Sequence, residues 1–203
     1  EIQVHADAVV LALGGGSWPQ LGSDGAWTEL LQARGVDVAP LQPSNCGFDI
    51  DWSEHLATRH AGAPLKPVVA HWKDANDIEN TLQGECVVSA HGIEGSLVYA
   101  LSAELRETLA RDGHATLHLD LAPGRSLERL QHDLSKPRGH RSASEHLRRQ
   151  AGITGVKAAL LYEALDKSQL DHPARVAATL HRYPLLLLRP RPLPEAISTA
   201  GGV

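Results

Sequence analysis

The chain has 203 residues, 42% of them hydrophobic, and a formal net charge of -5 at pH 7. This composition is typical of a soluble globular protein with one large core or two small ones, and the acidic balance argues against indiscriminate binding to nucleic acid or anionic lipid. No apolar run is long enough to span a membrane and no signal-peptide pattern opens the sequence, so we expect a cytoplasmic protein without a membrane partner.

The first predicted element is a strand over residues 8–13, an almost continuous apolar run typical of a strand buried on both faces of a parallel sheet. Residues 14–16 are glycines, which permit positive φ angles and a close approach of a ligand to the backbone. A helix with Trp27, Leu30 and Leu31 on one face follows. Strand, glycine turn and helix in this order resemble a nucleotide-binding corner.

The glycine turn alone does not establish a cofactor site, because many α/β proteins join strands to helices through glycine. The dinucleotide fingerprint G-x-G-x-x-G fails at Pro19, and no Walker lysine is present. The serine-hydrolase pattern G-x-S-x-G fails at the same proline. The main phosphate loop of any bound nucleotide is therefore expected outside this stretch.

A proline-bracketed linker ending at Pro43 predicts a domain boundary, after which short β-like stretches separated by Gly-, Asn- and Asp-rich turns predict an antiparallel sheet or small barrel. These stretches cover residues 47–50, 66–72, 81–89 and 115–121. A helix over residues 97–111 lies between the last two.

The pattern becomes helical and strongly charged over residues 123–155, and helical signal continues over residues 156–165 and 173–180. Residues 183–189 then predict a buried strand, followed by the stiff segment Pro190-Arg191-Pro192. These patterns indicate a helical subdomain inserted before a late strand of the sheet.

Three motifs taken together resemble one protein family. They are ADAVVLALGGGSWPQLGSDG at residues 6–25, GECVVSAHGIEGSLVYALS at 84–102 and RPRPLPEAISTAGGV at 189–203. Their order and spacing resemble the BaiN-like bacterial flavoproteins, also labelled aminoacetone-oxidase-like, over essentially the whole chain. The resemblance implies an FAD-dependent oxidoreductase that acts on a small-molecule substrate, with NADH or NADPH as a possible reductant.

The resemblance also implies an α+β fold, in which an insert made of an antiparallel β-barrel and a helical subdomain is flanked by segments of a Rossmann-type FAD-binding domain. On this basis residues 1–43 and 193–203 belong to the FAD-binding domain, residues 44–122 and 181–192 to the barrel, and residues 123–180 to the helical subdomain. The chain contains no methionine and ends on Gly201-Gly202-Val203. We therefore expect a middle fragment whose N- and C-terminal parts, including the main phosphate loop, are missing.

The resemblance places the cofactor contacts at the two glycine-rich ends, where Leu13 replaces the usual threonine. The residues implied are Leu13, Gly14, Gly15, Gly16, Ser17, Gly201 and Gly202. In the middle motif Ser96 replaces the usual proline, and His91 is a weak candidate for proton exchange with a substrate, since imidazole titrates near neutrality. The alternative is that His91 only caps a turn, and the catalytic residues stay unknown.

The sequence predicts no metal site. His114 and His118 lie about 13 Å apart if they share a strand, too far for one ion. The pair Asp49-x-Asp51 is interpreted as strand surface rather than as paired catalytic carboxylates. Cys46 and Cys86 form no C-x-x-C pair and are interpreted as ordinary thiols.

A basic cluster in the helical subdomain supports a second function class. It consists of Lys136, Arg138, Arg141, Arg148 and Arg149, opposed in sequence by Glu145. Such a face can meet RNA phosphates, as in a flavin-dependent enzyme that modifies an RNA base. A solvated surface is the simpler interpretation, because no aromatic residue is interleaved to stack a base. A third hypothesis is a non-catalytic interaction module.

Nothing in the sequence ties residues 14–17 and 201–203 into a sheet, so their geometry is expected to depend on the missing strands. Residues 8–13 are then left as an exposed apolar edge. FAD is held mainly by the phosphate loop and the ribose-binding acid of a Rossmann unit. We therefore expect the isolated chain to be colourless and inactive.

Overall fold

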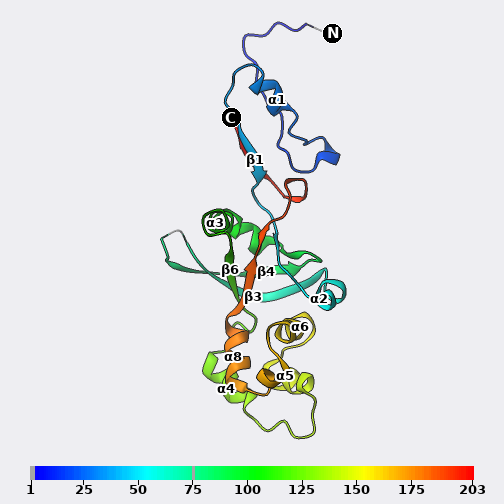
Figure 1. The fold of residues 1–203 in the computed structure, drawn as a ribbon, viewed down its shortest axis with the longest axis vertical. Coiled ribbons are helices and arrows are strands. Elements are labelled where there is room, and N and C mark those ends of the chain that lie inside the picture. Colours follow the sequence, from blue (N-terminus) through cyan, green and yellow to red (C-terminus); the bar gives the residue numbers. More distant parts are fainter. Residues whose placement is uncertain (1–2, 75) are drawn as a thin grey trace. The chain divides into compact units, whose positions relative to one another are not determined.

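The computed structural model describes residues 3–74 and 76–203 and divides into two compact units. The first unit contains residues 1–44 and 192–203, and the second contains residues 45–191. The chain therefore passes from the first unit into the second once and returns once (Figure 1).

The second unit is built on a seven-stranded sheet in which every neighbouring pair is antiparallel. In spatial order the strands are β7 (Tyr183–Leu187), β6 (Ala115–Asp120), β3 (Ala63–Lys73), β4 (Glu79–Val88), β5 (Gly92–Glu94), β2 (Phe48–Asp49) and β8 (Arg189–Pro190). The order is open, with β7 and β8 at its edges, so the hydrogen bonds among the described residues close no barrel. The α+β class predicted from the sequence is confirmed.

One face of this sheet is covered by α3 (Ser96–Asp112), which contacts β4 and β6. Its buried residues Leu97, Leu101, Leu105 and Leu109 recur every four positions, as expected for an amphipathic helix. Gly84 on β4 permits the close approach, because an added Cβ would lie 3.2 Å from the Cβ of Leu97. The helix predicted over residues 97–111 is therefore present and packs on the sheet core.

A helical group lies on the opposite side of the sheet from α3 (Figure 1). It consists of α4 (Leu127–Leu134), α5 (Ala143–Ala151), α6 (Gly155–Ala164), α7 (Lys167–Leu170) and α8 (Pro173–His181). The hydroxyls of Ser126 and Ser142 cap α4 and α5 by accepting backbone N–H bonds. Lys157 on α6 joins the group to the sheet, because its Nζ donates to the carbonyls of Pro67 at 2.8 Å and Leu121 at 2.7 Å.

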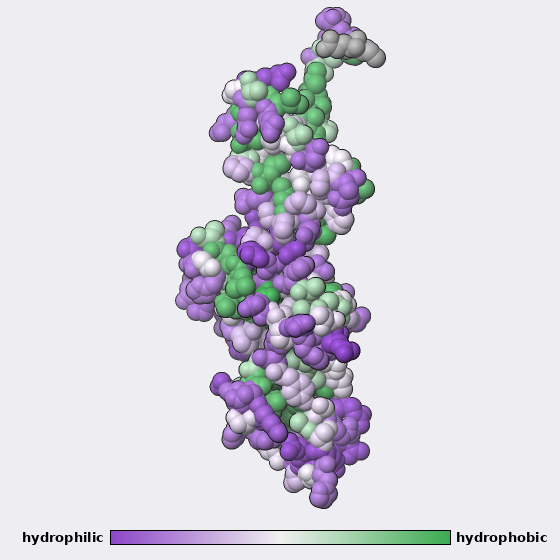
Figure 2. Space-filling view, turned by 45° about the vertical axis from the view of Figure 1, so that its right-hand side comes forward, coloured by the Kyte–Doolittle hydropathy of each residue, from purple (hydrophilic) through white to green (hydrophobic). Residues whose placement is uncertain are grey.

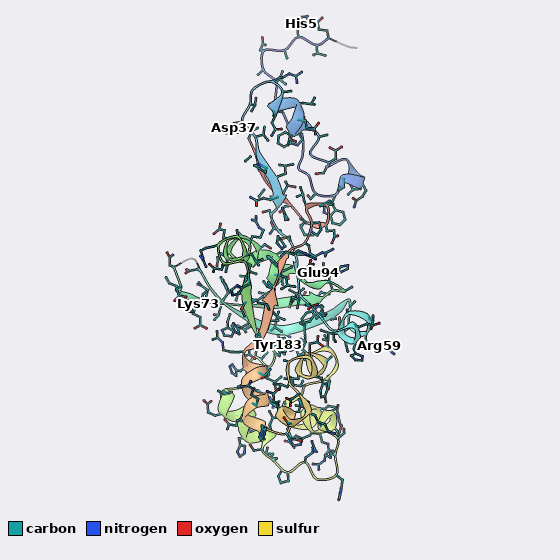
Figure 3. The ribbon with its side chains drawn as sticks, in the orientation of Figure 1. His5, Asp37, Arg59, Lys73, Glu94 and Tyr183 are labelled. Atoms are coloured by element: carbon teal, nitrogen blue, oxygen red, sulfur yellow. The ribbon has the colours of Figure 1, made fainter. Side chains whose placement is uncertain are left out.

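The late strand β7 differs from its prediction. Tyr183, Leu185 and Leu187 are buried, but Leu186 between them is 50% exposed. An edge strand of an antiparallel sheet packs only one face on the core, so the prediction of a fully buried strand is wrong. Figure 3 shows Tyr183 where the sheet meets the helical group, and burial raises the pKa of its hydroxyl.

Some short elements of this unit are absent from the predictions, among them α2 (Glu54–Arg59), α7 and the three-residue strand β5. α2 is capped by Ser53, whose Oγ accepts from the N–H of Leu56 at 3.3 Å and donates to Glu163 Oε2 at 2.7 Å. Leu56 is the buried residue of this helix. The two apolar residues of this helix, Leu56 and Ala57, are adjacent and give no periodic signal, which explains why the helix was not predicted.

The first unit contains α1 (Trp27–Gln32), the single 3-10 turns η1 (Pro19–Leu21) and η2 (Leu193–Glu195), and the paired strands β1 (Ala39–Pro43) and β9 (Thr199–Gly202). β1 and β9 are antiparallel, with Ala39 opposite Gly202 and Pro43 opposite Thr199. The expectation that nothing ties the closing glycines into a sheet is therefore wrong. The partner strand comes from the proline-bracketed segment, which the sequence pattern presented as a linker.

The strand predicted over residues 8–13 is also wrong. None of these residues is in a strand, and Val9, Val10 and Leu11 are exposed, Val10 at 87%. A strand buried on both faces needs pairing strands and covering layers, and no described residue pairs with this segment. Figure 2 shows hydrophobic residues on the surface, and the run is exposed, as the sequence led us to expect.

Within the described residues, no helix is both long enough and apolar enough to cross a membrane.

Candidate functional site

The side chain of Thr199 joins the two glycine-rich segments of the first unit. The backbone N–H groups of Gly16 and Ser17 both donate to Oγ1 of Thr199, at 2.9 and 3.1 Å. That hydroxyl donates in turn to Oγ of Ser17 at 3.3 Å. The opening turn is therefore held by β9, about 180 positions later in the chain.

Gly15 and Gly16 are both closely surrounded by side chains of the first unit. An added Cβ at Gly15 would lie 2.5 Å from Oγ1 of Thr199 and 2.8 Å from its Cβ. At Gly16 it would lie 2.9 Å from Leu193 and 3.0 Å from Leu41, so this glycine faces apolar side chains of the same unit. Packing against Thr199 is thus sufficient to require glycine at position 15, whereas at Gly16 the close atoms are the ends of two leucine side chains.

The side chain of Trp27 also contacts the two glycine-rich segments. Its Nε1 donates to the carbonyl of Gly14 at 3.1 Å, and an added Cβ at Gly202 would lie 3.2 Å from its ring. Gly14, Gly201 and Gly202 all have positive φ angles, of 76°, 90° and 103°, which favour glycine. The indole therefore contacts both glycine segments.

These segments enclose a shallow, open pocket of about 390 Å³. Its lining residues are Gly14, Gly15, Ser17, Trp27, Leu41, Ser198, Thr199 and Gly201. All of them are uncharged, and much of the wall is backbone or small side chain. Such a wall suits a flat or neutral group that approaches the main chain closely, and it offers no cation to a phosphate.

Four of the predicted cofactor residues line this pocket, namely Gly14, Gly15, Ser17 and Gly201. Gly16 and Gly202 support the pocket from behind, against Leu41, Leu193 and Trp27. Leu13 is 46% exposed and is not part of the wall. The role of all seven as cofactor ligands stays a prediction.

Sequence reasoning missed the residues that organise the pocket, above all Thr199. The hydroxyl of Thr199 lies within the closing motif but has no local signature, because its partners are at the other end of the chain. Trp27 was assigned to a helix face, whereas its ring nitrogen bonds to the glycine turn.

His91 lies in the second unit, in the turn between β4 and β5, and its side chain is exposed. Its carbonyl accepts from the N–H of Ile50 at 2.9 Å, so the backbone helps to hold this turn. A role for the imidazole in proton exchange stays a prediction.

Asp49 is buried, whereas Asp51 is exposed, so the two carboxylates do not form a pair. Oδ1 of Asp49 accepts from Nη1 of Arg191 at 2.7 Å, and Oδ2 accepts from Nε of Arg189 at 2.6 Å. Burial alone would raise the pKa of Asp49, but the hydrogen bonds from Arg191 and Arg189 lower it below its ordinary value. The interpretation as solvated strand surface is therefore wrong for Asp49, which is buried and paired with two arginines, and Asp51 lies outside the strand.

The described residues contain no group of three or more side chains placed to hold a metal ion. Both cysteines are free and buried. Burial raises the pKa of Cys86 to about 12 and also raises that of Cys46, so neither is an activated thiol.

The basic cluster is largely paired with carboxylates. Lys136 bonds to Asp133 at 2.6 Å and Arg138 to Asp171 at 3.0 Å. Arg148 and Arg149 both pair with Glu145. The sequence-based statement that only Glu145 opposes the cluster is therefore wrong.

The RNA interface stays a prediction. Its test is to neutralise Arg138, Arg141, Arg148 and Arg149 together and to measure RNA retention at several salt concentrations. If the variant loses a salt-dependent retention of RNA, the interface is supported. If RNA retention is unchanged and insensitive to salt, the interface is excluded.

The second unit, an open antiparallel sheet with a helical group, makes this an α+β protein. In the first unit, two glycine segments line one pocket, which is a candidate site for a flat ligand. A family model described as "HI0933-like protein barrel and H2TH domain" matches residues 42–198. The chain therefore belongs to the HI0933-like family, the BaiN-like flavoproteins that its three motifs resemble.

One similar protein is the 3-dehydro-bile acid delta(4,6)-reductase of Clostridium scindens, which is 29% identical over 119 residues. The alignment covers 58% of this chain but only 28% of that reductase. The chain thus matches about a quarter of the relative's length.

Proposed function

We propose that this chain is the central part of an FAD-dependent oxidoreductase and that its first unit contributes a secondary contact with the flavin cofactor. The observation that carries the proposal is the uncharged pocket between the two glycine segments, in a chain of a flavoprotein family. FAD, when bound, supplies hydride-transfer chemistry that side chains do not provide.

The pocket's wall supports this assignment and limits it. Gly14, Gly15 and Gly201 offer backbone to a ring or sugar edge, and Trp27 fixes the Gly14 carbonyl. The N–H groups of Gly16 and Ser17, which could otherwise bind an anion, are already bonded to Thr199. The residues present therefore fit a neutral part of FAD and leave its pyrophosphate to another loop.

The remaining assignments follow from the family. Residues 1–43 and 193–203 are assigned to the FAD-binding domain, residues 44–122 and 181–192 to the sheet insert and residues 123–180 to its helical subdomain. The insert is proposed to shape the substrate site, and NADH or NADPH to reduce the flavin. The relative's name supports a small-molecule substrate of the enone or 3-dehydro bile acid kind.

The test is flavin spectroscopy on the protein that contains this chain. We expect a yellow protein that releases FAD on denaturation, is bleached anaerobically by NADH or NADPH, and is reoxidised by one of a panel of amines, enoyl compounds and 3-dehydro bile acids. A protein without flavin, and without FAD binding on titration, would overturn the proposal.

Gly14→Ala and Gly22→Ala form a matched pair for locating the contact. Both glycines have positive φ angles, but only Gly14 lines the pocket, and an added Cβ at Gly22 meets no other atom. We expect Gly14→Ala to weaken FAD binding about tenfold, equivalent to about 1.4 kcal/mol, and Gly22→Ala to leave it nearly unchanged. Equal effects would mean that backbone strain, and not the pocket, is responsible.

A further inference from the structure

We propose that Thr199 is the positioning residue of the pocket: its hydroxyl fixes the backbone of Gly15–Ser17 and occupies the place that an anion would otherwise take. The geometry that points to this role is the convergence of two successive backbone N–H groups on Oγ1 of Thr199.

The hydroxyl uses its full hydrogen-bonding capacity in these contacts. A threonine hydroxyl has two acceptor lone pairs and one proton. Oγ1 accepts from Gly16 and Ser17 and donates to Oγ of Ser17, which is itself buried. Each of the three bonds therefore goes to the glycine turn.

Successive N–H groups that point to one spot form the concave arrangement that binds anions in many proteins. Here a neutral oxygen of the same chain fills that spot. The turn is therefore closed to a phosphate and kept in one shape, which leaves the backbone of Gly14 and Gly15 to face the pocket. Thr199 in this way selects a neutral ligand group at this site.

Thr199 is itself held independently of the turn. It lies on β9 opposite Pro43 of β1, and the N–H of Ser44 donates to the carbonyl of the preceding residue, Ser198, at 2.8 Å. The β1–β9 ribbon thus sets the position of the hydroxyl, and the hydroxyl sets the turn.

Gly15 completes the arrangement, because its added Cβ would overlap the Thr199 side chain. The Gly15→Ala substitution must displace the hydroxyl or the turn. It should therefore reproduce the effect of removing the hydroxyl, and the two changes together should cost no more than one of them.

The experiment compares Thr199→Val, which removes the hydroxyl at nearly constant volume, with Thr199→Ser, which keeps it, in the full protein that contains this chain. The first measurement is amide hydrogen exchange without added cofactor. We expect exchange at Gly16 and Ser17 to quicken about tenfold or more in Thr199→Val and to stay near wild type in Thr199→Ser, with the sheet amides of the second unit as an internal folding control. Unchanged exchange in Thr199→Val would overturn the positioning role.

The second measurement, the FAD dissociation constant from flavin fluorescence, rests on the proposed function. We expect Thr199→Val, Gly15→Ala and the double variant each to weaken FAD binding about tenfold. Thr199→Ser, which keeps the hydroxyl, should bind FAD about as tightly as the wild type. Faster exchange with unchanged FAD affinity would overturn the link to the cofactor. If the wild-type protein takes up no FAD, the proposed function fails, and hydrogen exchange alone still decides the role of Thr199.

Discussion

The substitution Asp49→Asn is expected to destabilise the chain by about 2–4 kcal/mol at neutral pH. The Asp49 side chain is 8% exposed and bonds to Arg191, at 17% exposure, and Arg189, at 77%. A charge-assisted hydrogen bond to a buried partner contributes about 1.5–3 kcal/mol. The pair with the exposed Arg189 is screened by solvent and adds at most about 1 kcal/mol.

The sign of the pH dependence follows from the lowered pKa of Asp49. The ordinary value is 3.8, and the folded-state value lies below it because the arginine hydrogen bonds outweigh the effect of burial. A carboxyl whose pKa is lowered by folding contributes stability above its unfolded pKa and loses it as the pH falls through the folded pKa. The difference between wild type and Asp49→Asn should therefore be constant near neutrality and shrink below about pH 4.

Urea unfolding followed by circular dichroism measures this difference, with Asp51→Asn as the matched control. Asp51 is exposed, so its substitution should change the free energy of unfolding by less than about 0.5 kcal/mol. Arg191→Leu should cost clearly more than Arg189→Leu, since Arg191 is the less exposed of the two partners. An Asp49→Asn loss below about 0.5 kcal/mol, or a loss that is the same at pH 3 and pH 7, would refute the reasoning.

Three further outcomes are expected. Ser102→Ala should lower the free energy of unfolding, measured by urea titration, by about 1–3 kcal/mol. The reason is that the buried N–H of Cys46 loses its acceptor, the Ser102 hydroxyl at 3.1 Å. Ser96 is exposed, so Ser96→Ala should be nearly neutral. Cys86, with a pKa raised by burial to about 12, should react with iodoacetamide at pH 8 only after unfolding, and rapid labelling of the native chain would contradict its burial. The isolated chain should be colourless and should not quench flavin fluorescence, and stoichiometric FAD retained through purification would contradict this.

Local periodicity was sufficient to predict the elements with strong patterns. The four-residue spacing from Leu97 to Leu109 predicted α3, and the alternating stretches predicted β3, β4 and β6. The late strand β7 was predicted as well, because an apolar run after a helical subdomain needs a sheet to cover it. Its exposed face was not predicted, since a run of four leucines does not show which of them face solvent.

The segment of residues 8–13 shows the opposite case. Its composition is typical of a strand buried on both faces, yet its valines are exposed. Apolar composition indicates that a segment needs burial, but it does not show whether pairing strands are present. The β1–β9 pairing was not predicted, for a related reason. Its pairing joins positions about 160 residues apart, and each strand alone has the proline and glycine content of a linker.

The candidate site changes the interpretation of the glycine turn itself. From the sequence, Gly14, Gly15 and Gly16 look alike, and all three suggest room for a ligand. In the structure Gly15 is required by Thr199, and Gly16 packs against the side-chain ends of Leu41 and Leu193, so both are in contact with protein and not with open space. Gly14 has a positive φ angle, and an added Cβ would meet only Oγ of Ser23 at 3.9 Å, so this glycine is not explained by close packing. The cofactor hypothesis therefore depends most on Gly14, and its substitution is the most informative test of this pocket.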